Sequence, residues 1–345
     1  MEIGYYNRSI LSQYDLDVDL FREFNIEVCD LNPSKNCYIL FCEKGKFILK
    51  QLDYGEEKFK FICRALEYTD KNLFKFIKPL KTKDGDLYKQ WKGKNYIILP
   101  MDNGVECDIN NHSHIILTTK AIADMHKASK GILNYMSNQY YDLIKWNSKL
   151  TQAIDNEIES LEAIKKYKEW VTRYVYKNEF DKIFLDSVDY YIQDIKESVA
   201  ILKNYGYEDM CRQKDTVAFC HGDLGPYNVI IKDDEAWLLN FHLSSIDLKI
   251  SDLSDYIYRV VRNYNFDFNI AKTIMETYTK YNNLREEERQ CLYGFLRYPC
   301  EFFYIVRDYY EKRVLPEEGY FLDKLVKSVN TRQEREEFLN KFQKH

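Results

Sequence analysis

His221-Gly222-Asp223-Leu224-Gly225-Pro226-Tyr227-Asn228 lies between two apolar runs of the chain, at 217–219 and 229–231. Its Asp and Asn are five residues apart, which is the spacing of a catalytic loop for phosphoryl transfer. In such a loop the Asp orients or deprotonates an attacking hydroxyl, and the Asn amide holds a metal ion on a triphosphate. The pattern therefore predicts Asp223 as the catalytic residue and Asn228 as a metal ligand.

The second metal position departs from this pattern. Nine residues after the second apolar run ends, where a carboxylate is expected, the chain has Asn240. A carboxylate holds a hard cation by its charge, whereas an amide offers only a neutral oxygen. If catalysis depends on that metal, the loss of charge costs roughly 3–4 kcal/mol of transition-state stabilisation. Two alternatives stay open: Asp247 serves as a substitute ligand, or Asn240 suffices for one magnesium ion and slow turnover.

These residues resemble the aminoglycoside phosphotransferase and choline kinase superfamily and, within it, the spore coat proteins of the CotS family of endospore-forming bacteria. The resemblance covers nearly the whole chain and is carried by segments at 10–14, 47–50, 104–108, 123–129, 247–253 and 297–303. It implies an α+β, two-lobed protein-kinase-like fold, with a small antiparallel-sheet N-terminal lobe and a large, mainly helical C-terminal lobe. It also implies a place in spore formation, with other spore coat proteins as partners.

Strand patterns dominate the first hundred residues. Turn residues at 32–34 and 43–45 separate short apolar runs, which predicts antiparallel strands. The loop expected to cover the phosphates has no Gly-x-Gly-x-x-Gly pattern, so close approach of its backbone to a phosphate is less favoured. The expected strands lie at 25–29, 37–41, 46–50, 87–91 and 96–100.

The resemblance places nucleotide contacts at the ends of two of these strands. Lys50 ends the third strand, where kinase-like folds hold the lysine that binds the α- and β-phosphates. Leu99 and Met101 lie at the end of the last strand, where backbone groups would meet the adenine edge. ATP and Mg²⁺ are therefore the expected cofactors, with Asn228 and Asn240 as metal ligands.

Lys50 is expected to pair with a glutamate of the amphipathic segment 56–67. Glu67 has the spacing from Lys50 that is nearest to the phosphotransferase pattern, and Glu56 and Glu57 stay open as alternatives. The choice among the three depends on which face of the helix turns toward the strand.

The character of the sequence changes near residue 102. Between 115 and 202 apolar residues recur at helical spacing, which indicates the core-facing stripes of amphipathic helices. We therefore expect an N-terminal lobe at 1–102 and a helical C-terminal lobe at 103–345. The catalytic loop should lie on a short hairpin spanning 217–241.

Polar residues outside the loop have simpler interpretations. Asp252 matches the superfamily's later Asp, which resembles a brace for the catalytic loop, and His242 is expected to be a polar residue with a hydrogen-bond partner. Glu157 and Glu159 could line a pocket for a cationic substrate, but a solvated helix face is the default interpretation.

Composition excludes several classes of partner. The chain has 345 residues, 45% of them apolar, and its net charge of −5 with no long basic run argues against nucleic acid or an anionic membrane. It has neither an apolar stretch near the roughly 18 residues of a membrane span nor a signal-peptide pattern, so we expect synthesis in a cytosol. The resemblance implies that this is the mother-cell cytoplasm, before incorporation into the spore coat. Its nine cysteines are irregularly spaced without Cys-x-x-Cys, which favours reduced, buried thiols over a zinc site.

Three functions fit these observations. The first is a coat component that keeps the kinase-like fold as a nucleotide-sensing module or scaffold, with chemistry weakened or lost at Asn240. The second is an active ATP-dependent phosphotransferase acting on a small hydroxylated molecule or a coat polysaccharide. The third is a protein kinase for other coat proteins, which ranks last because no activation segment is evident between Asn240 and Asp252.

Overall fold

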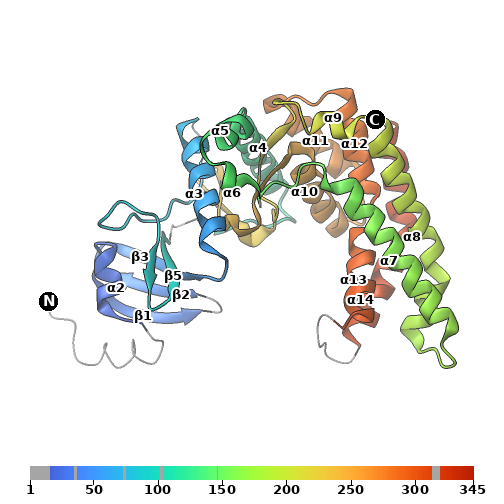
Figure 1. Ribbon diagram of the computed structural model, residues 1–345, viewed down its shortest axis with the longest axis horizontal. Coiled ribbons are helices and arrows are strands. Elements are labelled where there is room, and N and C mark those ends of the chain that lie inside the picture. Colours follow the sequence, from blue (N-terminus) through green and yellow to red (C-terminus); the bar gives the residue numbers. More distant parts are fainter. Residues whose placement is uncertain (1–15, 35–36, 73–74, 102–103, 146, 313–318) are drawn as a thin grey trace.

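The computed structural model describes residues 16–34, 37–72, 75–101, 104–145, 147–312 and 319–345 (Figure 1). A five-stranded sheet lies at one end of the molecule, and two long helices, α7 and α8, run side by side at the other. The two-lobed kinase-like fold class is confirmed by this arrangement. No helix in the described ranges is long and apolar enough to cross a membrane.

The N-terminal sheet is antiparallel throughout, with the strand order β1-β2-β3-β5-β4. Successive side chains of a strand point to opposite faces, so the sheet buries two apolar surfaces. Tyr96 and Ile98 pack toward α2, whereas Ile97 and Leu99 pack with Phe59 of α3. The elements are α2 (Val18–Glu23), β1 (Val28–Ser34), β2 (Cys37–Cys42), β3 (Gly45–Leu52), α3 (Glu56–Lys71), β4 (Lys89–Trp91) and β5 (Lys94–Pro100).

One turn prediction was wrong. The residues Asn32-Pro33-Ser34 continue strand β1 and do not reverse the chain, and Pro33 pairs with Tyr38 of β2. Because β1 is an edge strand, a proline there removes no hydrogen bond that a central strand would need. The expected reversal at 43–45 is confirmed, and the expected lobe boundary at 102–103 lies outside the described residues.

The remainder of the chain is mainly helical. The apolar stripes expected between 115 and 202 are the buried faces of α4, α7 and α8, which confirms that interpretation. The helices are α4 (His112–Ala128), α5 (Ile132–Gln139), α6 (Tyr141–Lys145), α7 (Gln152–Arg173), α8 (Glu179–Asn204), α9 (Tyr207–Met210), α10 (Lys249–Asn263), α11 (Phe268–Tyr281), α12 (Glu286–Arg297), α13 (Cys300–Tyr310), α14 (Tyr320–Asn330) and α15 (Arg332–Gln343).

The expected single hairpin at 217–241 is divided between two small sheets. β7 pairs with β10, whereas β8 pairs with β9 and β6. Residues 221–228 separate β7 from β8, which exceeds the usual hairpin loop of about two to five residues. The strands are β6 (Val105–Glu106), β7 (Val217–Cys220), β8 (Val229–Lys232), β9 (Glu235–Leu238) and β10 (Ser245–Leu248), with 3-10 turns η1 (Pro226–Asn228) and η2 (Phe241–Leu243).

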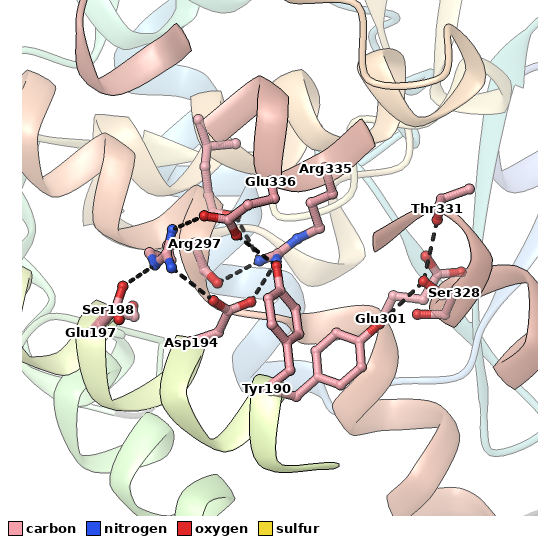
Figure 2. Close-up of polar contacts among 12 residues, drawn as sticks. Tyr190, Asp194, Glu197, Ser198, Arg297, Glu301, Ser328, Thr331, Arg335 and Glu336 are labelled. Carbon is pink, nitrogen blue, oxygen red and sulfur yellow. Dashed lines mark hydrogen bonds and ion pairs between the residues drawn. The ribbon is translucent and has the colours of Figure 1, made fainter. Parts of the chain in front are cut away.

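A buried ionic cluster joins α8, α12 and the C-terminal α15 (Figure 2). Asp194 of α8 lies between two guanidinium groups, 3.1 Å from that of Arg297 and 2.5 Å from that of Arg335. The Arg335 guanidinium also donates to the Arg297 carbonyl, and Glu336 and Glu197 complete the charges around Arg297. Helix α15 is thus held to α8 by buried charges that compensate one another.

Candidate functional site

Four residues from three segments of the chain meet in one series of hydrogen bonds. Lys50 of β3 donates from Nζ to Asn240 Oδ1 at 3.1 Å. Asn240 Nδ2 in turn donates to Asn228 Oδ1 at 2.9 Å, and Asn228 Nδ2 donates to Asp223 Oδ2 at 2.9 Å. The structure therefore brings together Lys50, Asn240, Asn228 and Asp223, all of which the sequence pattern had singled out for the same site.

Local backbone features hold the two asparagines in place. Asn228 ends the 3-10 turn η1, and its carbonyl accepts the Leu239 amide at 3.1 Å, which ties the catalytic loop to the end of β9. Asn240 follows with a φ of 64°, in the left-handed region that Asn tolerates better than most residues. This conformation aims its side chain back between Lys50 and Asn228.

Asp223 is buried and its carboxylate is fully engaged. The Tyr227 hydroxyl donates to both oxygens, at 3.1 and 3.2 Å, and Arg259 of α10 forms an ion pair with Oδ1 at 2.8 Å. The sequence interpretation missed both partners. A signal for Arg259 was available, because it lies seven residues after Asp252 and therefore on the same helix face.

Asp252 braces the catalytic loop as expected. Its carboxylate accepts the backbone amides of His221, at 2.6 Å, and Gly222, at 2.8 Å, and contacts His126 Nε2 at 3.2 Å. Burial alone would raise the pKa of Asp252, but the hydrogen bond and charge of His126 bring it below its usual value. Cys220 lies close enough to His126 and Asp252 for a shared metal ion, but the Asp252 oxygens are already used by the loop.

Gly222 allows the loop to approach η2. Its φ is +76°, and a Cβ at this position would lie 2.5 Å from the Leu243 carbonyl oxygen. Gly222→Ala is therefore expected to destabilise the protein by about 1–3 kcal/mol through strain, and by more through the clash. Urea denaturation measures this. Gly206→Ala is the matched control, since Gly206 has a φ of +74° and open space around it; equal losses in the two variants would contradict the clash.

The side-chain oxygens that could bind Mg²⁺ in this site are already engaged in other contacts. Asn228 Oδ1 already accepts from Asn240, and Asn240 Oδ1 already accepts from Lys50. The carboxylate of the site, Asp223, is ion-paired with Arg259. Mg²⁺ needs oxygen ligands in near-octahedral geometry and is usually held by one or two carboxylates. A divalent ion here would have to break two hydrogen bonds without gaining an additional carboxylate.

Asp247 is not in position to replace the missing ligand. Its carboxylate accepts from the Leu248 amide at 2.7 Å and from the Ser251 hydroxyl at 3.0 Å. Burial raises its pKa to about 6. Its partners lie at the start of α10, so the hydrogen bonds of Asp247 are made there and not to the Asn228–Asn240 pair.

Glu67 does not reach Lys50. Its carboxylate bonds Arg64, at 2.7 Å, on the solvent-exposed face of α3. The two alternatives, Glu56 and Glu57, bond Lys60 on the same helix. The physical reason is the orientation of α3, which turns its apolar residues inward: Phe59, Phe61, Ile62, Ala65 and Leu66. Burial lowers the pKa of Lys50, opposed by the charges of Asp53 and Cys37.

The two residues expected at the adenine edge have structural partners of their own. The Met101 amide donates to the Lys46 carbonyl at 3.0 Å, so this amide is not free for a base in this conformation. Leu99 is buried in the apolar layer between the sheet and α3, opposite Ile48 in the strand register. His242, as expected, has a polar partner and contacts the Asn240 carbonyl at 3.0 Å.

A cavity of about 1040 Å³ lies beside the catalytic loop. It is lined by Gly222 and by residues of α7, α10 and α13, among them Arg259 of α10. Glu157 lines it and is only 4% exposed, so the default interpretation as a solvated residue was wrong. Its Oε2 has no hydrogen-bond partner among the described residues, and burial raises its pKa to about 8. Glu159 also lines the cavity but is exposed.

Solved structures with the same fold are phosphotransferases. An aminoglycoside phosphotransferase from Alicyclobacillus acidocaldarius superposes with a TM-score of 0.83 at 16% identity, over 95% of this chain and 96% of that one. Spectinomycin phosphotransferase APH(9)-Ia, in complex with ADP and spectinomycin, gives 0.62 at 14% identity over 95% and 98%. Amicoumacin kinase hAmiN, in complex with AMP-PNP, Ca²⁺ and Ami, gives 0.57 at 14% identity over 98% and 94%.

The sequence profile of the family described as "Spore coat putative kinase YutH" matches residues 8–342. The match covers nearly the whole chain, and the chain therefore belongs to this spore coat family. The expected resemblance to spore coat proteins with a phosphotransferase fold is confirmed.

Proposed function

We propose that this member of the spore coat family is a nucleotide-binding coat component whose phosphoryl-transfer chemistry is weakened or lost. It is made in the mother-cell cytoplasm and then joins the spore coat, where other coat proteins are its partners. The observation that carries the proposal is the chain of hydrogen bonds from Lys50 through Asn240 and Asn228 to Asp223. It keeps the lysine, the loop Asp and the loop Asn of a phosphotransferase but has an amide at the remaining metal position.

The charge around Lys50 supports nucleotide binding. Its ammonium group is partly buried and bonds a neutral amide, where a kinase would offer a carboxylate. Partial burial of a cation is unfavourable, and it lowers the pKa of Lys50 because the charge of Asp53 offsets the effect of burial only in part. A phosphate group in the cleft would supply the missing negative charge.

The surroundings of Asp223 support weakened catalysis. A substrate hydroxyl must approach one of its oxygens, yet Arg259, Tyr227 and Asn228 already donate to them. An acceptor would have to displace one of these donors. With Asn240 in place of a carboxylate, the site also lacks the negative charge that normally fixes the metal on the triphosphate.

The alternative function is an active kinase for a small hydroxylated molecule or a polysaccharide. The cavity of about 1040 Å³ beside Asp223 favours it, because the cavity holds a buried carboxylate, Glu157, with an unpaired oxygen. Such a group would suit a cationic or hydrogen-bond-donating acceptor. Release of ADP from ATP in the presence of hydroxylated amines or sugars, above the rate without acceptor, would favour this alternative.

Nucleotide binding is the test of the proposal. Titration calorimetry with ATP, with and without Mg²⁺, is expected to show weak binding, and Lys50→Met should weaken it about tenfold because a charge-assisted hydrogen bond is lost. Lys46→Met is the matched control, since Lys46 lies exposed on the same strand. The absence of both heat and a thermal shift at millimolar ATP would contradict the proposal.

A further inference from the structure

We propose that this site holds the nucleotide phosphates without a divalent metal ion, with Arg259 supplying the positive charge that the metal would otherwise bring. The inference rests on the proposed function, since it specifies how the nucleotide is bound. It concerns the two cations that flank the hydrogen-bonded chain. Lys50 bonds Asn240 at one end, and Arg259 pairs with Asp223 at the other.

The balance of charge in the site does not favour a divalent cation. Lys50 and Arg259 are two cations, and Asp223 is the carboxylate that faces Arg259. Asn228 and Asn240 lie between the cations and are neutral. A site built for a divalent cation normally has an excess of negative ligands. Here Lys50, Arg259 and Asp223 together carry one net positive charge, which Asp53 near Lys50 offsets, so these side chains lack the excess of negative charge that a divalent cation needs.

The hydrogen bond between the Asn240 and Asn228 amides occupies the metal position. Asn240 can donate to Asn228 Oδ1 because its side chain ends in an NH₂ group, and this bond is 2.9 Å long. A carboxylate at the same position could not donate, and would leave the Asn228 oxygen free. The substitution therefore removes a charge and at the same time occupies the neighbouring ligand. Both changes oppose a divalent ion.

Arg259 is suited to bind phosphate. Its side chain is 41% exposed, and it lines the cavity beside the catalytic loop. A guanidinium has five N–H donors in a planar fork, of which one bonds Asp223 at 2.8 Å. The remaining donors match the geometry of a phosphate, which arginine binds in a bidentate manner. Asp223 keeps the fork next to the position where a terminal phosphate would meet the loop.

Calorimetry of ATP and ADP in EDTA and in excess Mg²⁺ tests the inference. For the native chain the ATP affinity is expected to differ less than about threefold between the two conditions, whereas metal-dependent sites differ by far more. Arg259→Gln should weaken ATP binding in EDTA by about tenfold, as expected for the loss of one charge-assisted contact. The effect on ADP should be smaller if Arg259 contacts the terminal phosphate.

Arg262→Gln is the matched control. Arg262 lies on the same helix with the same 41% exposure, but it pairs with Glu301 at 3.0 Å and not with Asp223. Its replacement removes the same charge and should leave ATP binding in EDTA unchanged. Thermal melting of each variant verifies that it is folded.

The outcomes separate the inference from the function on which it rests. ATP binding that occurs only with Mg²⁺ would overturn metal-free binding while leaving nucleotide binding intact. Equal losses in Arg259→Gln and Arg262→Gln would show a general charge effect and overturn the role of Arg259. Failure of ATP and ADP to bind in either condition would overturn both proposals.

Discussion

Asp194→Ala is expected to lower the free energy of unfolding by about 3–5 kcal/mol, because it leaves the buried guanidinium of Arg335 without its carboxylate partner. The Asp194 side chain is 1% exposed and bridges the guanidinium groups of Arg297 and Arg335, which are 9% and 6% exposed. Removing the carboxylate takes away the ion pair of Arg335 at the junction of α8, α12 and α15, whereas Arg297 keeps Glu197 and Glu336 (Figure 2). Urea denaturation followed by circular dichroism measures the loss.

An exposed ion pair on the same helix provides the control. Asp189 contacts Lys168 at 2.6 Å, but its side chain is 74% exposed. Asp189→Ala should therefore cost no more than about 1 kcal/mol, as exposed pairs usually do. If both variants lose the same stability, the buried cluster does not hold the C-terminal helix in the way that its geometry indicates.

The catalytic segment could be predicted because its determinants are local. Asp223, Asn228 and Asn240 lie within eighteen residues of one another, and the apolar runs between them fix strands whose ends meet. Lys50 is distant in sequence, and the structure places it within β3, two residues before that strand ends, with its side chain bonded to Asn240. Residue spacing therefore carried most of the information needed for the four-residue chain.

Long-range packing explains what the sequence interpretation missed. Arg259 contacts Asp223 because α10 packs against the loop, and the sequence could place Arg259 only relative to Asp252 on the same helix. Glu157 resembles a solvated residue in the sequence, but in the fold it is only 4% exposed and lines the cavity beside α10 and α13. Glu67 fits by spacing, yet the apolar stripe of α3 turns it toward solvent. In each case the sequence gives the residue type, and helix orientation decides its role.

Asn240→Asp is expected to make nucleotide binding depend on Mg²⁺ and to increase ATP hydrolysis. The new carboxylate supplies a negative charge and, having no NH₂ group, releases Asn228 Oδ1 from its present bond. The two ligands of the metal position are thus restored by one substitution. The left-handed backbone of Asn240, at a φ of 64°, is also tolerated by aspartate. We expect a gain of about 100-fold in hydrolysis, by analogy with restoring an electrostatic stabiliser, measured as ADP release together with calorimetry in Mg²⁺ and in EDTA.

Two further variants assign the gain to the metal position. Asp223→Ala in the Asn240→Asp background should abolish the gain in hydrolysis, because the loop carboxylate is then missing, while the Mg²⁺-dependent affinity remains. Asp247→Asn in the native chain should change little, since Asp247 bonds Leu248 and Ser251 at the start of α10. The opposite pattern is equally informative. If Asn240→Asp leaves the Mg²⁺ dependence unchanged while Asp247→Asn abolishes it, Asp247 is the true ligand, the assignment of Asn240 is wrong, and the native protein is an active kinase.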